Sequence, residues 1–203
     1  MRGKKLSEMT LEELWKLFPI YLTEHHSCWK EWYSEEEILL KNNLYSTERI
    51  SHIGSTAIPS IWAKPIVDIL VEIPKGSNLL DYKALIINNG YICMSQSENG
   101  LSFNKGYTEN GFAERVFHLH LRYVGDNNEL YFRDYLIEHP DIANILTGCR
   151  IFGSILLLFF PAFSLGFYII YLLCGFSDKV HRHSCMLHCN TFCNSRGGLC
   201  YYR

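Results

Sequence analysis

The chain has 203 residues, of which 48% are hydrophobic, which is enough for one domain with a sizeable core. Its net charge is −2 and its pI about 6.5, so no overall basic field indicates a nucleic-acid-binding protein. Residues 1–5 are basic, but residues 6–18 are amphipathic and rich in Glu, which argues against a secretory signal. We therefore expect residues 1–143 to be cytoplasmic.

The composition changes abruptly near residue 144. Residues 1–143 hold 34 of the 40 Asp, Glu, Lys and Arg residues and two of the eight cysteines. Residues 144–203 hold the other 6 charges and six cysteines. We therefore predict a folded domain over 1–143 and a tail of different character over 144–203.

Periodicity predicts the elements of the first part in chain order. Helical spacing and capping residues predict helices over 10–18, 29–44, 79–89 and 130–138. In the second of these, Trp32, Ile38 and Leu39 are expected on a different face from Glu35, Glu36 and Glu37. Strands are predicted over 20–22, 50–53, 66–73, 91–94, 101–103 and 115–123.

Two of these strands define the expected fold. The segment 66–73 is almost continuously apolar, which indicates a central strand covered on both sides. The segment 115–123 alternates strictly, so its members divide between two faces: Phe117, Leu119, Leu121 and Tyr123 on one, and Val116, His118, His120 and Arg122 on the other. The elements together predict an α+β fold, a twisted mixed sheet with helices packed on it.

A Gly-Ser turn follows the predicted strand 50–53. Gly54 allows the backbone to turn sharply and to approach a ligand closely. Free N–H groups at a following helix start would suit a phosphate, and Ser55 and Thr56 add hydroxyl donors. The alternative is an ordinary strand-to-helix turn with a Ser or Thr cap.

Asp68 lies thirteen residues after Ser55, inside the most apolar strand. A carboxylate there costs free energy unless it is paired, hydrogen-bonded or bound to a metal. The alternative is a structural Asp satisfied by Lys64 or by a loop backbone. Gly-Ser followed by a strand Asp resembles nucleotidyltransferases of the DNA polymerase beta type, in which the Gly-Ser contacts phosphates and the Asp holds a divalent metal.

Four motifs in order extend this resemblance: residues 52–59 (HIGSTAIP), 63–69 (AKPIVDI), 118–120 (HLH) and 132–136 (FRDYL). Over roughly residues 10–143 the chain resembles the GrpB family. That family has a nucleotidyltransferase-like fold, and its domain is also found fused to dephospho-CoA kinase. The resemblance implies a cleft lined by six residues: Gly54, Ser55, Lys64, Asp68, His118 and His120.

The usual metal set of polymerase-type transferases is incomplete here. They carry Asp-x-Asp or Asp-x-Glu on the first catalytic strand, and two metals then clamp the attacking and leaving oxygens. In this chain the second position is Leu70. Glu72 lies four residues from Asp68, roughly 13 Å along a strand and too far to share an ion.

His118 and His120 offer another way to bind a metal, because they lie two apart on one strand face. With Asp68 they would form a two-His, one-carboxylate set for a divalent metal such as Mg, Mn, Fe or Zn. The alternatives are phosphate binding, hydrogen bonding within the cleft, or a solvated face. Lys64, Arg122 and Arg133 are candidate phosphate contacts, and each has an ordinary structural alternative.

The tail supports three interpretations. Residues 151–176 carry no charge and are long enough to span a bilayer. Seven Cys and His residues over 181–200 could bind zinc or form disulfides. The match to the family ends near Ala143, where a charged helix normally continues, and the new composition is typical of translation in a shifted reading frame.

The sequence thus predicts a nucleotidyltransferase-fold protein that uses a divalent metal to transfer a nucleotidyl or phosphoryl group to an unknown acceptor. Asp68, His118 and His120 would carry the chemistry, and the partner would be a nucleotide or another phosphate-bearing small molecule, not a nucleic acid. One alternative is a non-catalytic phosphate-binding module, favoured by Leu70. Another is the inactive product of a damaged gene, favoured by the tail.

Overall fold

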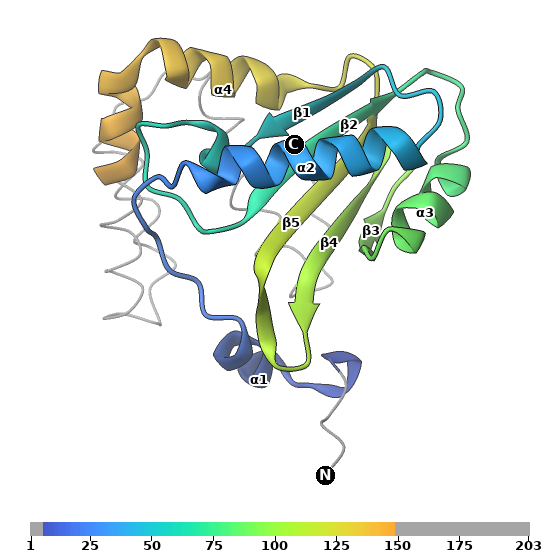
Figure 1. The fold of residues 1–203 in the computed structure, drawn as a ribbon, viewed down its shortest axis with the longest axis horizontal. Helices are drawn as coiled ribbons and strands as arrows, with labels where there is room; N and C mark the ends of the chain where they lie inside the picture. The colour runs from blue at the N-terminus through green and yellow to red at the C-terminus, as the bar shows by residue number, and fades with distance from the viewer. Residues whose placement is uncertain (1–5, 149–203) are drawn as a thin grey trace, which may run out of the picture. The chain divides into compact units, whose positions relative to one another are not determined.

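The computed structural model describes residues 6–148 (Figure 1). The helical segments of this part include η1 (Leu6–Glu8), α1 (Leu11–Leu17), α2 (Cys28–Asn43), η2 (Ser55–Ala57), α3 (Leu79–Asn88) and α4 (Asn128–Glu138). Residues 140–148 are helical as well. The strands are β1 (Arg49–Ile53), β2 (Val67–Ile73), β3 (Ile92–Gln96), β4 (Gly100–Thr108) and β5 (Gly111–Tyr123). They form one mixed sheet in the order β1-β2-β5-β4-β3, which confirms the predicted α+β class.

The helix starts follow the capping residues in the sequence. Thr10 accepts a hydrogen bond from the Glu13 backbone, and the Glu13 carboxylate accepts one from the Thr10 backbone, which is the predicted capping box of α1. The Asn78 side chain caps α3 by accepting from the Leu80 N–H. Gly90, just past the end of α3, takes a φ of +87°.

The sheet differs from the predicted strands in two places. Residues 20–22 form no strand; the following residue, Thr23, makes one isolated bridge to Ala63. The strand predicted over 101–103 extends to Thr108, because it pairs with the long strand β5 in a hairpin. β2 pairs in parallel with β5 and antiparallel with β1, so it lies inside the sheet as predicted.

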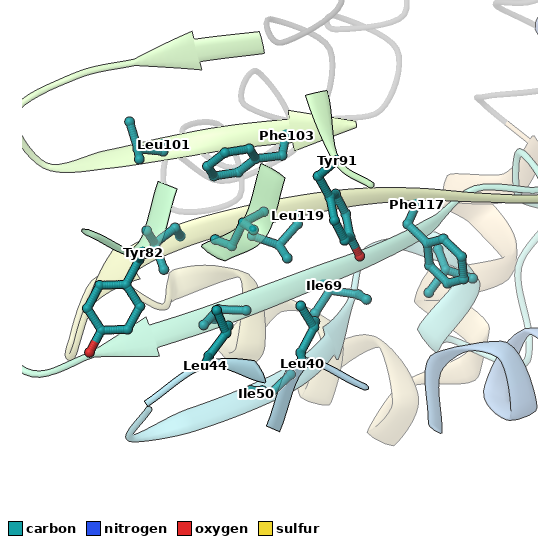
Figure 2. Close-up of a cluster of buried hydrophobic side chains, with 14 of the residues drawn as sticks. Leu40, Leu44, Ile50, Ile69, Tyr82, Tyr91, Leu101, Phe103, Phe117 and Leu119 are labelled. Atoms are coloured by element: carbon teal, nitrogen blue, oxygen red, sulfur yellow. The ribbon is translucent and has the colours of Figure 1, made fainter. Parts of the chain in front are cut away.

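The main core lies between one face of the sheet and the helices α2 and α3. Figure 1 shows α2 crossing in front of β1 and β2. Figure 2 shows side chains from several elements meeting there, among them Leu40 of α2, Tyr82 of α3, Ile69 of β2 and Leu119 of β5. All four are 0 or 1% exposed, so this cluster supplies most of the apolar burial that holds the helices on the sheet.

Helix α2 turns a different face inward from the one the sequence predicts. Its buried residues are Trp29, Glu36 and Leu40, whereas Ile38 is 61% exposed. Glu36 can be buried because it accepts hydrogen bonds from the Lys105 ammonium at 2.7 and 3.0 Å and from the Tyr91 hydroxyl at 2.9 Å. The Glu36 carboxylate, with all its partners in place, therefore occupies a buried position at which the helical pattern predicts an apolar residue.

The opposite face of the sheet carries the polar residues of β2. There Leu70 packs with Ile53 of β1 and Leu130 of α4, so β2 is covered on both sides as predicted. Asp68 and Glu72 share this face with Leu70, because alternate residues of a strand point the same way. The packing of α4 therefore places two carboxylates in partly or fully buried surroundings.

The chain divides into two units, Met1–Asn144 and Ile145–Arg203, and every element named above belongs to the first. No helix within residues 6–148 is both long enough and apolar enough to span a membrane. The predictions for the tail, namely a membrane span over 151–176, a Cys and His site, and a shifted reading frame, concern residues outside the described part of the chain.

Glu72 is a buried carboxylate with a structural role. It is 0% exposed and accepts hydrogen bonds from Arg49 at 2.6 Å, Asn127 at 2.8 Å and the Gly125 N–H at 3.2 Å. Burial alone would raise the pKa of Glu72, but these three donors outweigh it and lower the pKa. The network ties β1 and the turn before α4 to the central strand.

We expect Glu72→Gln to lower the free energy of unfolding by about 2 kcal/mol at pH 7, because charge-assisted hydrogen bonds to a buried group are lost. The folded pKa of Glu72 is depressed, so its contribution is present above the ordinary Glu pKa and is lost as the pH falls through the folded pKa. Urea unfolding at several pH values would measure both effects, and the difference between wild type and variant should shrink in acid.

Glu35→Gln is the matched control, because Glu35 pairs with Arg115 at the surface and its side chain is 62% exposed. That substitution should change the free energy of unfolding by less than about 0.5 kcal/mol. Equal effects of the two substitutions, or a Glu72→Gln effect that grows in acid, would contradict the structural role of Glu72.

Candidate functional site

Three strands bring the predicted site residues to one face of the sheet. The register places Ile53 of β1, Asp68 of β2 and His118 of β5 side by side. Two residues further along the same strands, His120 lies opposite Leu70. Because β2 and β5 are parallel, Asp68 and the two histidines point the same way. The structure therefore assembles the Asp68, His118 and His120 group that the spacing predicts.

The Asp68 carboxylate lies between the two imidazoles. Its Oδ1 is 3.3 Å from His118 Nδ1 and 3.9 Å from His120 Nε2, and the side chain is 24% exposed. Burial alone would raise the pKa of Asp68, but hydrogen bonding and charge from His118 and His120 outweigh it and hold the pKa well below its usual range. Asp68 is therefore ionised at neutral pH and partly open to a ligand.

Gly54 makes room for this carboxylate. It has a φ of +69°, and a Cβ built on it would lie 2.4 Å from Asp68 Oδ2. The backbone turn thus fits against Asp68 only because residue 54 has no side chain. The sequence predicts close approach of Gly54 to a ligand; the structure shows close approach to Asp68 itself.

The turn that follows Gly54 is shorter than the predicted helix. Residues Ser55–Ala57 form a single 3₁₀ turn, in which the Ala57 N–H bonds to the Gly54 carbonyl. Ser55 is half-buried, and Thr56 is 1% exposed with its hydroxyl 2.9 Å from His52 Nε2. Thr56 is thus committed to an internal contact, while Ser55 remains the more accessible hydroxyl.

His52 and Arg133 hold in place the end of β1 that leads into the Gly54–Ser55 turn. The His52 ring stacks on Tyr33 with 4.9 Å between centroids, and burial lowers the pKa of His52 to about 4, so the ring is neutral. Arg133 of α4 donates to the His52 carbonyl at 2.7 Å and to the Asp134 carboxylate. Arg133, a predicted phosphate contact, is therefore seen here fixing the end of β1 just before Gly54.

Tyr107 is a site residue that the sequence analysis missed. Its hydroxyl lies 2.9 Å from Nε2 of His118, on the far side of the ring from Asp68. Burial, assisted by the negative charge of Asp68, raises the pKa of Tyr107 to about 12, so the phenol keeps its proton. A series of contacts therefore runs from Tyr107 through a hydrogen bond to His118 and from His118 through an ion pair to Asp68, with His120 beyond it.

Two other predicted phosphate contacts are Arg122 and Lys64. Arg122 donates to the carbonyls of Leu101 and Leu121 at 3.0 Å, and it is four residues, about 13 Å, along β5 from His118. The structure does not bring Arg122 to Asp68. Lys64 lines a hollow of about 210 Å³ whose walls include Tyr21, Trp32 and Phe112.

The remaining carboxylate of β2 is not available to the site. Glu72 is saturated by its three donors, and Leu70 separates it from Asp68. Among residues 6–148, no group of three or more His, Cys, Asp and Glu side chains is arranged so that it could hold a metal ion. In the structure Asp68, His118 and His120 form an ion-paired cluster, and the divalent metal at these residues stays a prediction.

The molecule is thus an α+β domain whose central strand presents a carboxylate to two histidines beside a Gly-Ser turn. The model of the GrpB protein family matches residues 19–145, and the chain belongs to this family. It is 33% identical over 147 residues to UPF0157 protein YqkA of Bacillus subtilis, in an alignment covering 68% of this chain and 42% of that protein. It is 31% identical over 131 residues to the glutamate-rich protein GrpB of Alkalihalophilus pseudofirmus, covering 61% of this chain and 75% of that one.

A solved structure of the same family agrees with this assignment. The crystal structure of the conserved protein GrpB from Enterococcus faecalis matches with a TM-score of 0.58 and 27% identity, over 74% of this chain and 93% of that one. A more distant likeness is to the Cid1 poly(U) polymerase, with a TM-score of 0.40 and 16% identity over 57% of this chain, a level that says nothing about activity. The chain spans about two fifths of the length of YqkA.

We expect Gly54→Ala to lower the free energy of unfolding by more than about 2 kcal/mol, because it adds a clash with Asp68 to the cost of a positive φ. Gly76→Ala is the matched control: its φ is +90°, but nothing lies within 4 Å of the added Cβ. It should show the backbone cost alone, about 1 kcal/mol. Urea unfolding would measure both, and equal costs would contradict the close contact between Gly54 and Asp68.

Proposed function

We propose that this domain binds a phosphate-bearing small molecule of the nucleotide class at the Asp68 cluster and transfers a nucleotidyl or phosphoryl group from it to an acceptor. The observation that supports this most directly is the position of Asp68, an ionised carboxylate in a central strand with a 24% exposed side chain. Strongly perturbed carboxylates in partly buried surroundings are typical of functional sites. The Gly54–Ser55 turn beside it supplies the expected phosphate contact.

We assign proton exchange with the substrate to His120, which is the less tightly held of the two imidazoles although its side chain is 15% exposed against 25% for His118. Its Nε2 is 3.9 Å from Asp68 Oδ1, a longer contact than the 3.3 Å of His118 Nδ1, and His118 also contacts the Tyr107 hydroxyl. In the proposed transfer, an acceptor hydroxyl gives its proton to His120 while its oxygen bonds to phosphorus. The bond from phosphorus to the leaving phosphate oxygen breaks, and Asp68 stabilises the imidazolium that results.

This proposal contains no step that uses a metal ion. Two-metal phosphoryl transfer needs several converging carboxylates, but here Leu70 and the saturated Glu72 leave Asp68 as the carboxylate of this face that the site can use. The predicted divalent metal is therefore tested in the binding experiment below, which is run with and without metal ions. A second function, a binding module without catalysis, is favoured by Leu70, which occupies the position where polymerase-type transferases carry a second carboxylate.

We expect nucleoside triphosphates to raise the unfolding temperature of the full chain and this shift to be lost in Asp68→Asn, because the phosphates would contact the two imidazoles that the Asp68 carboxylate holds in place and not the carboxylate itself, which has the same sign of charge. The physical reason is that a ligand stabilises only the state that binds it. Thermal-shift titrations would use ATP, GTP, CTP, UTP and inorganic pyrophosphate, each with and without Mg²⁺, Mn²⁺ or Zn²⁺. Incubation of any binder with the protein, followed by chromatography, would detect release of pyrophosphate or phosphate.

Asp126→Asn is the matched control, because Asp126 is an exposed carboxylate whose contact with Arg122 is 3.8 Å long. It should bind as the wild type does. Binding that depends on Asp68, followed by product release, supports the transferase, and binding without release supports the module. Absence of any shift, or a shift kept in Asp68→Asn, would overturn the proposed site.

A further inference from the structure

Tyr107 reaches the site through an irregularity in β4. Lys105 pairs with Phe117 across the hairpin, but Tyr107 pairs with Phe112, so the register shifts between them. Gly106 lies at this point with a φ of +92°, and a Cβ on it would lie 2.3 Å from the Arg115 carbonyl. In a regular strand Lys105 and Tyr107 would point to the same face. Here Lys105 contacts Glu36 on the α2 side, whereas the Tyr107 hydroxyl contacts His118 beside Asp68.

An aromatic group holds the Tyr107 ring in this position. Phe18, directly after α1, lies 4.9 Å from the Tyr107 ring centroid and 5.0 Å from that of Phe112, and the Tyr107 and Phe112 centroids are 5.1 Å apart. Figure 1 shows α1 beside the tip of the β4–β5 hairpin. Such ring contacts restrict rotation of the phenol, so its hydroxyl is directed at one ring nitrogen of His118.

The hydrogen bonds at the two His118 nitrogens determine where its proton lies. An ionised Asp68 can only accept, so the nitrogen facing it, Nδ1 at 3.3 Å, has to be the donor. The other nitrogen, Nε2, faces a phenol that retains its proton and can donate at 2.9 Å. In a neutral imidazole one nitrogen donates and the other accepts, and the partner of one nitrogen sets the state of the other.

We propose that Tyr107 is a positioning residue whose hydroxyl holds neutral His118 in the tautomer that carries its proton on Nδ1, so that this proton is directed at the Asp68 carboxylate. With His118 held in this way, Asp68 keeps its charge, and His120 is the imidazole that we assign to proton exchange with a substrate. The tautomer itself stands on the geometry of Tyr107, His118 and Asp68. Its value for group transfer rests on the proposed function.

The test is ¹⁵N NMR of the full chain labelled on histidine, at about pH 8.5, well above the ordinary imidazole pKa. The nitrogen shifts and their couplings to the ring protons distinguish the two tautomers. His118→Gln identifies the His118 signals among those of the nine histidines. In the wild type we expect the proton on Nδ1, and in Tyr107→Phe we expect the shifts to move toward the averaged values of a free histidine.

Tyr135→Phe is the matched control. Its ring stacks on His139 with 4.2 Å between centroids, so removal of that hydroxyl should leave the His118 and His139 signals in place. A wild-type His118 protonated on Nε2 would overturn the proposal without any variant, and so would an unchanged tautomer in a folded Tyr107→Phe. If the tautomer is confirmed but no phosphate compound binds, the positioning role stands and the proposed function fails.

Discussion

A carboxylate in the central strand of the sheet sets the constraint on which the site depends. Removing an ionised Asp from water costs several kcal/mol unless partners replace the lost hydration. Asp68 meets this cost with imidazoles on the neighbouring strand and with a backbone turn that approaches it closely at Gly54. The parallel pairing of β2 with β5, the glycine at position 54 and the position of Tyr107 all serve that one arrangement.

Comparison with two other buried carboxylates shows what is particular to Asp68. Glu36 is surrounded by the Lys105 ammonium and the Tyr91 hydroxyl, and Glu72 by three donors. Both carboxylates link elements of the fold, and their hydrogen bonds leave them little capacity to bind a ligand. Asp68 has one imidazole at 3.3 Å and another at 3.9 Å, and it retains some exposure to solvent. An incompletely satisfied charge of this kind is available for binding or chemistry, which is why the proposed function is placed there.

Much of the fold and part of the site could be predicted from local pattern. The continuous apolar run of β2, the strict alternation of β5 and the capping box of α1 each depend on neighbouring residues, and each was confirmed. The alternation also predicted that His118 and His120 share a face. The remaining features of the site depend on the register between strands, which local pattern does not give. The pairing of Asp68 with His118 across β2 and β5 is what shows that these two residues meet.

The errors also have physical causes. Glu36 was expected on a polar face, but Lys105, 69 residues away, allows it to be buried. Arg122 stays a predicted phosphate contact, but alternation gives the face of a residue and not its distance along the strand, and Arg122 lies four residues along β5 from His118. Tyr107 was missed because the predicted strand ends at residue 103, whereas β4 continues to Thr108, and because the bulge at Gly106 reverses the face on which Tyr107 would otherwise lie. A glycine within a strand is a local sign of such a bulge.

The site depends on an Asp68 carboxylate that stays ionised because of its histidine partners. Titration of the Asp side-chain carboxyl groups by ¹³C NMR, with Asp68→Asn to identify the resonance, measures this directly. We expect Asp68 to titrate well below the ordinary Asp pKa of about 3.9, and we expect replacement of both His118 and His120 by Gln to raise its pKa above that value. A wild-type Asp68 that titrates at or above the ordinary value would show that the histidines do not hold it ionised.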